Sequence, residues 1–459
     1  MDSEVQVRKM EVDYSGTVEK LIPEAIAQAK EGDINGSIEK LIAMEKQTRL
    51  ACDVFSTEKI LVTIVRILYD AQQFDSLCEQ VVALSKKRSQ LRQAVTKMVQ
   101  EGCKFVEELA DETIKFKLIE TLRSVCEGKI YVENERARLT KILADHKESH
   151  GQLEEAVKLM IELQVETYNT MDRREKVNFI LEQMRFCLDN NDFIRAQIIS
   201  KKVSTRYFED EETHDLKLRF YRLMIRLDKH EGSHLDICKH FHAVYETPMI
   251  KANESDKFMA LKSVVLFICL AEYGNEQADF MNRVSLDKNL KEEPMKMYHN
   301  LLKLFLTSEI ISWSALEANY GNELRAGSKS NPPPEVFTGE EGEKAWKCLK
   351  ERVVEHNIRV MTEYYTRVKL ERMSILLDLP PEEVEICISK LVFKEMIYAR
   401  IDGLTNIVSF KKPRDAAKVL DDWAVSINGL MNLMSHTSHL IDKEFMVHKY
   451  ANAKGVAAR

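Results

Sequence analysis

The chain has 459 residues, of which 44% are hydrophobic and 31% charged, and its formal net charge is −7. The length exceeds what one compact domain needs, and the acidic balance lacks the basic footprint of a general nucleic-acid binder. The longest apolar run, Val264–Leu270, is much too short to span a membrane. These properties argue against a nucleic-acid-binding or membrane-embedded protein and predict a compound or extended architecture.

The amino terminus and the cysteines bear on the cellular compartment. Met1–Gly16 is charged and lacks the apolar core of a secretion signal. The nine cysteines are scattered without any C-x-x-C pair, which is typical of free thiols in a reducing compartment. We therefore expect a cytoplasmic and nuclear protein with neither a disulfide framework nor a zinc site.

A recurring turn organises the first two thirds of the chain. No proline occurs between Pro23 and Pro248, and glycine is sparse there, so we expect helices separated by short turns. Each turn has a polar break, then an apolar residue, then a small or apolar residue three positions later. The apolar residues are Ile34, Phe74, Leu153, Phe193 and Leu235, with Ile114 at the place of a poorly matching further copy. A period near 40 predicts an α-solenoid of TPR-like helix pairs over 16–325, after a flexible tail over 1–15.

Any all-helical protein has turns at roughly this interval, and that is the alternative to a solenoid. The small or apolar residue recurs in phase, which favours the solenoid. Within this region the apolar pattern predicts helices over Leu153–Asn169 and Lys257–Tyr273. The second is apolar nearly all round, so we expect it in the interior.

The pattern changes after a proline-rich loop. Gly327–Pro334 reads GSKSNPPP, which predicts a loop over 326–342, and Glu343–Tyr364 then predicts a helix. Leu379-Pro380-Pro381 ends one short helix and starts another, because proline is tolerated only in a first helical turn. The predicted elements that follow are helices over Lys369–Leu377 and Glu382–Met396 and strands over 397–401 and 406–410. Two helices followed by a β-hairpin predict a winged helix over 343–413.

The residues between Arg367 and Phe410 also follow a known pattern. They are Arg367, Val368, Leu370, Arg372, Met373, Leu376, Leu377, Glu383, Val384, Glu385, Ile388, Leu391, Val392, Ile397, Ala399, Ile401, Asp402, Ile407, Val408 and Phe410. This pattern resembles the winged helix of a PCI domain, a module that the proteasome lid, the signalosome and a translation initiation factor share. Asn406 stands where many PCI turns carry glycine, and asparagine tolerates left-handed backbone better than most residues. Taken end to end, the chain resembles the PCI-domain subunits of the proteasome lid, in which the PCI module would cover about 245–413.

This resemblance implies a function. It implies a non-catalytic structural and scaffold subunit, needed for assembly of the 19S regulatory particle and for ubiquitin-dependent protein degradation, with no cofactor. It also implies a hetero-oligomer whose partners are other PCI lid subunits, the lid deubiquitinase with its partner, and the proteasomal ATPase ring. The nearest alternative is a PCI subunit of the signalosome or of a translation initiation factor complex.

The last informative element is a long helix over 414–450, followed by a tail over 451–459. A coiled-coil-like stripe repeats every seven residues along it, which favours a bundle with other subunits over a helix that folds back on its own domain. In the hairpin, we expect a short exposed edge to pair with a neighbouring subunit by strand addition. The predicted partner-binding residues are Ile397, Ile407, Val408 and Phe410 in the hairpin, and Leu420, Trp423, Ile427, Met434, Ile441 and Phe445 in the helix.

No catalytic or metal motif survives a check of its spacing. GNELRAGSKS, from Gly321 to Ser330, has one residue too many between its glycines for a phosphate loop. His234 and His242 lie about 12 Å apart along a helix, so one zinc ion cannot take both together with Cys238. His240-Phe241-His242 resembles the H-x-H motif of lid-type deubiquitinases, but Ala243 stands where that motif has proline. We therefore predict no enzyme and no metal centre.

Two readings from other classes stay open against the scaffold. A winged helix can read DNA through its second helix, but the helix over Glu382–Glu395 is net acidic and phosphate would repel it. A hydrolase or metalloprotein with a site assembled from dispersed residues is the other. Metal content and activity of the isolated chain distinguish that reading from a scaffold.

Overall fold

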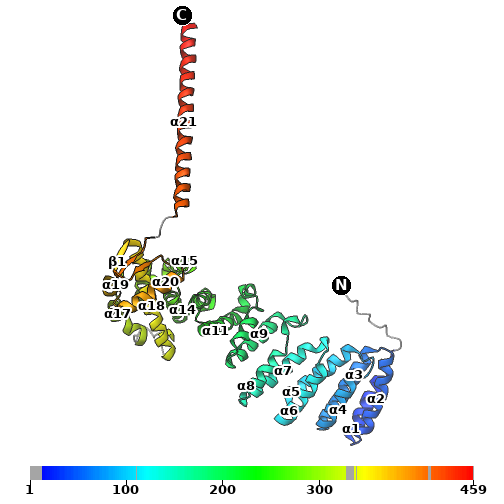
Figure 1. The fold of residues 1–459 in the computed structure, drawn as a ribbon. Coiled ribbons are helices and arrows are strands. Elements are labelled where there is room, and N and C mark those ends of the chain that lie inside the picture. The colour runs from blue at the N-terminus through cyan, green and yellow to red at the C-terminus, as the bar shows by residue number, and fades with distance from the viewer. Residues whose placement is uncertain (1–12, 110, 327–334, 338, 412–414, 458–459) are drawn as a thin grey trace. The chain divides into compact units, whose positions relative to one another are not determined.

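The computed structural model describes residues 13–109, 111–326, 335–337, 339–411 and 415–457 (Figure 1). They form two compact units, residues 1–264 and 265–459, which are described separately. Most of the expected tail over 1–15 and of the loop over 326–342 lies outside the described residues. All nine cysteines are described and are free thiols, as predicted. Among the described residues, no helix combines the length and apolarity needed to cross a membrane.

Unit 1 is a succession of helix pairs, and Figure 1 shows α1 to α8 stacked in sequence order. Apolar side chains between the helices form two continuous clusters, one reaching from Val18 to Leu143 and the next from Ala137 to Leu227. The helices are α1 (Ser15–Lys30), α2 (Ile34–Leu50), α3 (Val54–Asp70), α4 (Phe74–Ser85), α5 (Arg92–Glu108), α6 (Glu112–Cys126), α7 (Glu133–Ser149), α8 (Leu153–Ile161), α9 (Arg173–Asp189), α10 (Phe193–Ser200), α11 (His214–Glu231), α12 (His234–Tyr245), α13 (Pro248–Ala252) and α14 (Glu254–Leu270). The α-solenoid prediction is confirmed.

The recurring turn has one backbone geometry in five pairs. The residue two positions before the second helix has a positive φ, at Gly32, Gln72, Gly151, Asn191 and Gly232. The next backbone N–H reaches back to a carbonyl five residues earlier, for example from Gln152 to Lys147 at 2.9 Å. This closure satisfies carbonyls that a helix end leaves unpaired. The predicted apolar residues begin or nearly begin the second helices.

The position three residues later, which holds a small or apolar residue, is buried in all five pairs. Its occupants are all at most 1% exposed. A side chain there must fit against the adjacent helix, which explains why the position recurs in phase. The occupants are Ser37, Leu77, Ala156, Ala196 and Cys238.

One helix is shorter than its sequence pattern indicates. We expected a helix over Leu153–Asn169, but α8 ends at Ile161 and only a 3₁₀ turn, η2 (Val165–Thr167), follows. The buried amide of Gln183 donates to the carbonyls of Met160 and Leu163 at 2.8 and 2.9 Å. A side chain from the next helix therefore satisfies the helix end, and local periodicity does not encode that contact.

Unit 2 begins within α14 and ends in a winged helix. Its further helices are α15 (Asn275–Ser285), α16 (Lys296–Leu306), α17 (Trp313–Ala326), α18 (Gly339–Tyr364), α19 (Leu370–Leu377), α20 (Pro381–Phe393) and α21 (Ala416–Ala457). The strands are β1 (Arg367–Lys369), β2 (Arg400–Asp402) and β3 (Ile407–Ser409). Short 3₁₀ turns precede α7, α11, α16 and α18 as well as α9.

The sheet has one strand more than predicted. Its order is β1-β3-β2, both pairings are antiparallel, and Val408 lies between Val368 and Ile401. β1 is three residues long and becomes a strand only through pairing with β3, so its sequence shows no strand period. Asn406 has a φ of 51°, as its tolerance of left-handed backbone predicted, and its carbonyl accepts from the Leu370 N–H at 2.8 Å.

The terminal helix α21 is longer than predicted. It continues to Ala457, whereas we expected it to end at residue 450. The added residues are mostly alanine and lysine, which favour helix, with a single glycine at position 455. Every side chain from residue 415 to residue 450 is exposed.

Candidate interaction surfaces

The hairpin residues predicted to bind a partner fall into two groups. Val408 is 0% and Phe410 8% exposed, and both belong to the core of the winged helix. Ile397 and Ile407 are half-buried. β3 is the central strand of the sheet and its two neighbours occupy its hydrogen-bonding edges, so the exposed edge that we expected in the hairpin can only be that of β2. The outer edges of the sheet belong to β1 and β2.

Two other apolar side chains of the winged helix are openly exposed. Leu404, at the tip of the β2–β3 turn, is 97% exposed, and Phe393, at the end of α20, is 90% exposed. The Asp402 carboxylate accepts from the Leu404 N–H at 3.2 Å and from the Thr405 hydroxyl at 2.7 Å, so the turn that presents Leu404 is well defined. These hydrogen bonds, that from Thr405 first, lower the pKa of Asp402. The sequence contained a signal for this site, namely a lone leucine within a polar turn.

The first turn of α20 exposes acidic side chains. Glu382 and Glu383 lie in its first turn, where the helix dipole favours negative charge, and both are exposed. Ile386, on the same helix, is 55% exposed. An acidic helix with exposed apolar side chains fits a protein partner better than a phosphate backbone.

The predicted stripe on α21 is exposed throughout. A second apolar row lies one position earlier along the helix, about 100° around it. Together the rows give an apolar arc too wide for one coiled-coil seam, and such an arc fits contact with more than one helix. The predicted residues have exposed fractions of 59% for Leu420, 64% for Trp423, 42% for Ile427, 61% for Met434, 51% for Ile441 and 72% for Phe445. The second row, which we did not predict, consists of Val419, Leu433, Leu440 and Val447, at 44%, 66%, 48% and 53%, and is interrupted by Ser426.

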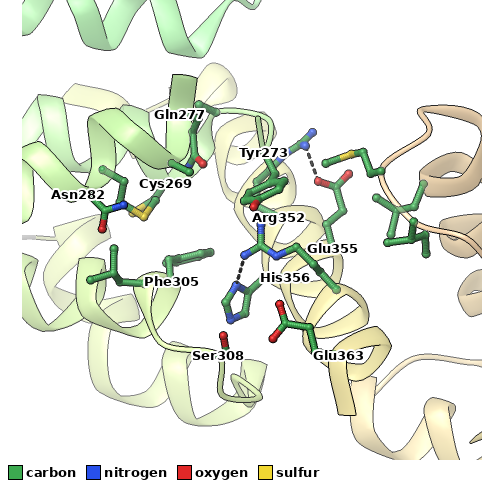
Figure 2. Close-up of a pocket in the computed structure, with 18 residues that line it drawn as sticks. Cys269, Tyr273, Gln277, Asn282, Phe305, Ser308, Arg352, Glu355, His356 and Glu363 are labelled. Carbon is green, nitrogen blue, oxygen red and sulfur yellow. Dashed lines mark hydrogen bonds and ion pairs between the residues drawn. The ribbon is translucent and has the colours of Figure 1, made fainter. Parts of the chain in front are cut away.

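A cavity of about 220 Å³ lies inside unit 2, and charged side chains of α18 converge on it (Figure 2). The Arg359 guanidinium lies 3.6 Å from the centroid of the Tyr273 ring, and its Nη2 lies 3.1 Å from Nδ1 of His356. The other ring nitrogen of His356 lies 3.1 Å from the carbonyl oxygen of Glu309. Both nitrogens of His356 are therefore engaged, with Nε2 donating and Nδ1 accepting.

The charged side chains that line this cavity interact with one another and so link several elements of unit 2. Burial, aided by the positive charge of Arg359, lowers the pKa of His356, and burial raises the pKa of Glu355. Arg352 contacts Glu355, and it also lies 3.6 Å from Glu272, to which Lys394 of the α20 end binds at 2.8 Å. The cluster thus connects α18 to the α14–α15 connection and to the winged helix.

The candidate metal ligands of the sequence have separate partners. The Cys238 thiol is buried and donates to the carbonyl of Val264 at 3.2 Å. His240 lies 3.0 Å from a carboxylate oxygen of Asp228, and His242 lies 3.7 Å from Glu246. The structure does not bring these histidines and the cysteine together around one position.

Three known families match consecutive parts of the chain. Residues 36–253 match the family described as "PSMD12/CSN4, N-terminal", which covers most of the solenoid. Residues 334–412 match the PCI domain, and residues 418–449 match the "26S proteasome regulatory subunit RPN5 C-terminal domain". The winged helix and α21 thus correspond to two separate matches.

Several proteins are similar over nearly the whole length. The "26S proteasome non-ATPase regulatory subunit 12" of Dictyostelium discoideum is 40% identical, covering 96% of this chain and 96% of that protein. The regulatory subunit rpn501 of Schizosaccharomyces pombe is 38% identical over 97% and 99%. The regulatory subunit RPN5 of Saccharomyces cerevisiae is 35% identical over 96% and 97%. The chain therefore belongs to the Rpn5 family of 26S proteasome regulatory subunits, whose members include non-ATPase regulatory subunit 12.

Proposed function

We propose that this chain is a non-catalytic structural and scaffold subunit of the proteasome lid. In this role it is needed for assembly of the 19S regulatory particle and hence for ubiquitin-dependent protein degradation. The observation that carries the proposal is similarity over 96% of the chain to proteins named as 26S proteasome regulatory subunits. This similarity includes the solenoid, the PCI domain and the terminal helix.

The exposed surfaces support the proposal that different parts of the chain bind different partners. The winged helix contacts other PCI lid subunits through its outer strands and the exposed Leu404 and Phe393. The terminal helix α21 enters a bundle with helices of other lid subunits, which buries its two apolar rows. The remaining proposed partners are the lid deubiquitinase with its partner and the proteasomal ATPase ring. The setting is the cytoplasm and the nucleus, with which nine free thiols agree.

The absence of catalysis by this chain is part of the proposal. The Dictyostelium relative is named a non-ATPase subunit. His240 and His242, which stand closest to a deubiquitinase motif, have carboxylate neighbours at separate places. In this proposal, other subunits of the assembly catalyse its reactions, and this chain positions those subunits.

The signalosome and initiation-factor alternatives receive less support. The description of the amino-terminal match names both a proteasome and a signalosome subunit, so this match alone does not separate them. The match over residues 418–449 and the three relatives over nearly full length carry proteasome names. These two observations favour the proteasome lid.

Co-purification tests the assignment directly. The full chain, tagged at its amino terminus, is isolated from cells under native conditions, and its partners are identified by mass spectrometry. We expect PCI lid subunits, the lid deubiquitinase and proteasomal ATPases in comparable amounts. Recovery of signalosome or initiation-factor subunits without the ATPases would overturn the assignment.

A further inference from the structure

Three potential metal ligands meet in the solenoid, on helices that contribute to none of the surfaces described above. They are Glu112, at the start of α6, and His146 and His150, in and just after the last turn of α7. One ligand atom of each lies within 4.8 Å of a ligand atom of the other two. This is the one such group found among the described residues. The sequence did not reveal it, because Glu112 is distant from the histidines along the chain.

The local fold explains why the three residues converge. His146 and His150 are four positions apart, so their side chains lie on the same face of α7. α6 packs against α7, which brings the first residue of α6 beside that face. Phe116, one turn further along α6, lies against the His146 ring with 3.7 Å between the ring centroids. This contact restricts the rotation of the His146 imidazole.

A backbone contact orients the second histidine for metal binding. Nδ1 of His150 lies 3.0 Å from the carbonyl oxygen of His146 and 3.2 Å from the Ser149 hydroxyl, which donates its own proton to that carbonyl at 2.6 Å. Because a carbonyl only accepts, Nδ1 carries the proton and Nε2 keeps a free lone pair. Histidine ligands of metals are held in this way, with the nitrogen that does not bind metal donating to a carbonyl or carboxylate.

The contact between Glu112 and His146 leaves room for an ion. A carboxylate oxygen of Glu112 lies 3.9 Å from Nε2 of His146, which is too long for a hydrogen bond. Two ligands bound to one tetrahedral zinc ion lie roughly 3.3–3.5 Å apart, given metal–ligand bonds of about 2.0–2.2 Å. Small rotations of partly exposed side chains close that difference.

We propose that Glu112, His146 and His150 form a binding site for Zn²⁺. Two imidazoles and one carboxylate suit zinc, whereas Mg²⁺ and Ca²⁺ require mainly oxygen ligands. Three protein ligands leave a fourth position for water. The ion ties the first turn of α6 to the end of α7, and thereby fastens two successive helices of the solenoid. Because it binds the folded chain, zinc raises the melting temperature.

Competition with a chromophoric chelator tests the site on the full chain after stripping with EDTA. We expect one equivalent of Zn²⁺ to be withheld from the chelator by the unaltered chain. His146→Ala and His150→Gln should each weaken this binding at least tenfold, and Glu112→Gln should weaken it less. His150→Gln replaces an exposed side chain, so a melt in EDTA that matches the unaltered chain separates lost binding from lost folding.

A matched control addresses adventitious binding by exposed histidines. The pair His436 and His439 lies on α21 and is exposed. We expect His436→Ala/His439→Ala to leave the tight equivalent unchanged. Failure of the unaltered chain to withhold zinc, equal binding by His150→Gln, or loss of the equivalent in the α21 variant would each overturn the proposal.

Cobalt substitution identifies the ligand atoms. Co²⁺ bound to nitrogen and oxygen ligands absorbs weakly in the visible range, whereas Co²⁺ bound to a thiolate adds an intense near-ultraviolet charge-transfer band. The chain has nine free thiols, so this distinction matters. We expect the visible band alone, lost in His150→Gln. A thiolate band at one equivalent would assign the ion to cysteine and refute the site.

Discussion

Glu182 on α9 forms an ion pair with Arg219 on α11, with 2.9 Å between the carboxylate and the guanidinium. Arg185, on the same helix as Glu182, approaches its other oxygen at 2.9 Å, and Lys141 on α7 lies at 3.5 Å. One nearly buried carboxylate thus connects three successive first helices of the solenoid. A further ion pair, between Arg138 on α7 and Glu175 on α9 at 2.7 Å, joins two of the same helices. We call these ion pairs the Glu182 ladder.

We predict that Glu182→Gln lowers the free energy of unfolding by about 1–3 kcal/mol. The glutamine removes a carboxylate that is 11% exposed and deprives Arg219 and Lys141 of it, whereas Arg185 keeps Glu148 and Asp189. Chemical denaturation of the full chain, with the loss of helical circular dichroism as readout, measures the change in the free energy of unfolding.

An exposed ion pair provides the control. Glu155 binds Lys147 at 2.7 Å, but its side chain is 55% exposed. Exposed pairs contribute about 0–1 kcal/mol, so Glu155→Gln should change stability by less than Glu182→Gln does. Equal effects of the two substitutions would show that the Glu182 ladder has no special role in joining the repeats.

The stabilisation by Glu182 should depend on pH. Burial by itself raises the pKa of Glu182, but hydrogen bonds from Arg219 and Arg185 outweigh it, and the pKa is lowered from the ordinary 4.5. Because its pKa is lower in the folded state, the carboxylate stabilises the fold fully above about pH 4.5. It loses this effect as the pH falls through the pKa of the folded state. The stability difference between the unaltered chain and Glu182→Gln should therefore be constant near neutral pH and shrink under acid conditions. A difference that grows on acidification would contradict this pKa shift.

The solenoid turns were predictable because their cause is local. A left-handed residue at positions such as Gly151 ends one helix, and a small buried residue such as Ala156 follows at a fixed spacing. Strand β1 and the early end of α8 were not predictable, because each depends on a distant partner. Ser409 pairs with Arg367 in the first case, and Gln183 caps carbonyls in the second.

The interaction surfaces were only partly predictable for the same reason. The seven-residue repeat of α21 is visible in sequence. By contrast, the sequence pattern around an apolar β-branched residue such as Val408 is the same whether its side chain packs in the core or contacts a partner. The strand order decides between these roles, and it places Val408 at the centre of the sheet. Glu112 and His146 meet only through helix packing, so no motif announces them.

Substitutions on the wing should weaken lateral association without unfolding the chain. We predict that Leu404→Ser and Phe393→Ser each reduce affinity for a neighbouring PCI subunit by about 1.5–3 kcal/mol, because each removes a large apolar side chain that the contact would bury. Both side chains are at least 90% exposed, so the melt should not change. Binding to the neighbouring subunit, measured by calorimetry, gives the affinity.

Two controls frame this experiment. Leu286→Ser removes a side chain that is 75% exposed but lies just after α15, outside the winged helix, and should leave the affinity unchanged. Val408→Pro should instead unfold the winged helix, because proline in a central strand removes a ladder hydrogen bond. If Leu404→Ser and Phe393→Ser bind like the unaltered chain, the wing tip is not the lateral contact.

The terminal helix should be required for assembly and dispensable for folding. A chain cut after Arg414 should melt at nearly the same temperature as the full chain, because the described side chains of α21 up to residue 450 are exposed. It should fail to enter the lid, since burying each large apolar side chain of the stripe contributes about 1.5–3 kcal/mol. Melting curves and a native-gel assembly assay measure the two properties.

Single substitutions test whether both apolar rows of α21 are buried in the bundle. Ile427→Asp places a charge in the predicted stripe, and Leu433→Asp places one in the second row, which lies on a different side of the helix. A charge buried at either place is costly, so each should reduce incorporation. Asn432→Asp, on the polar side, adds the same charge and should assemble normally. If only Ile427→Asp is defective, α21 meets one helix through a narrow seam. If the truncated chain melts lower, α21 braces its own domain, and the bundle proposal is refuted.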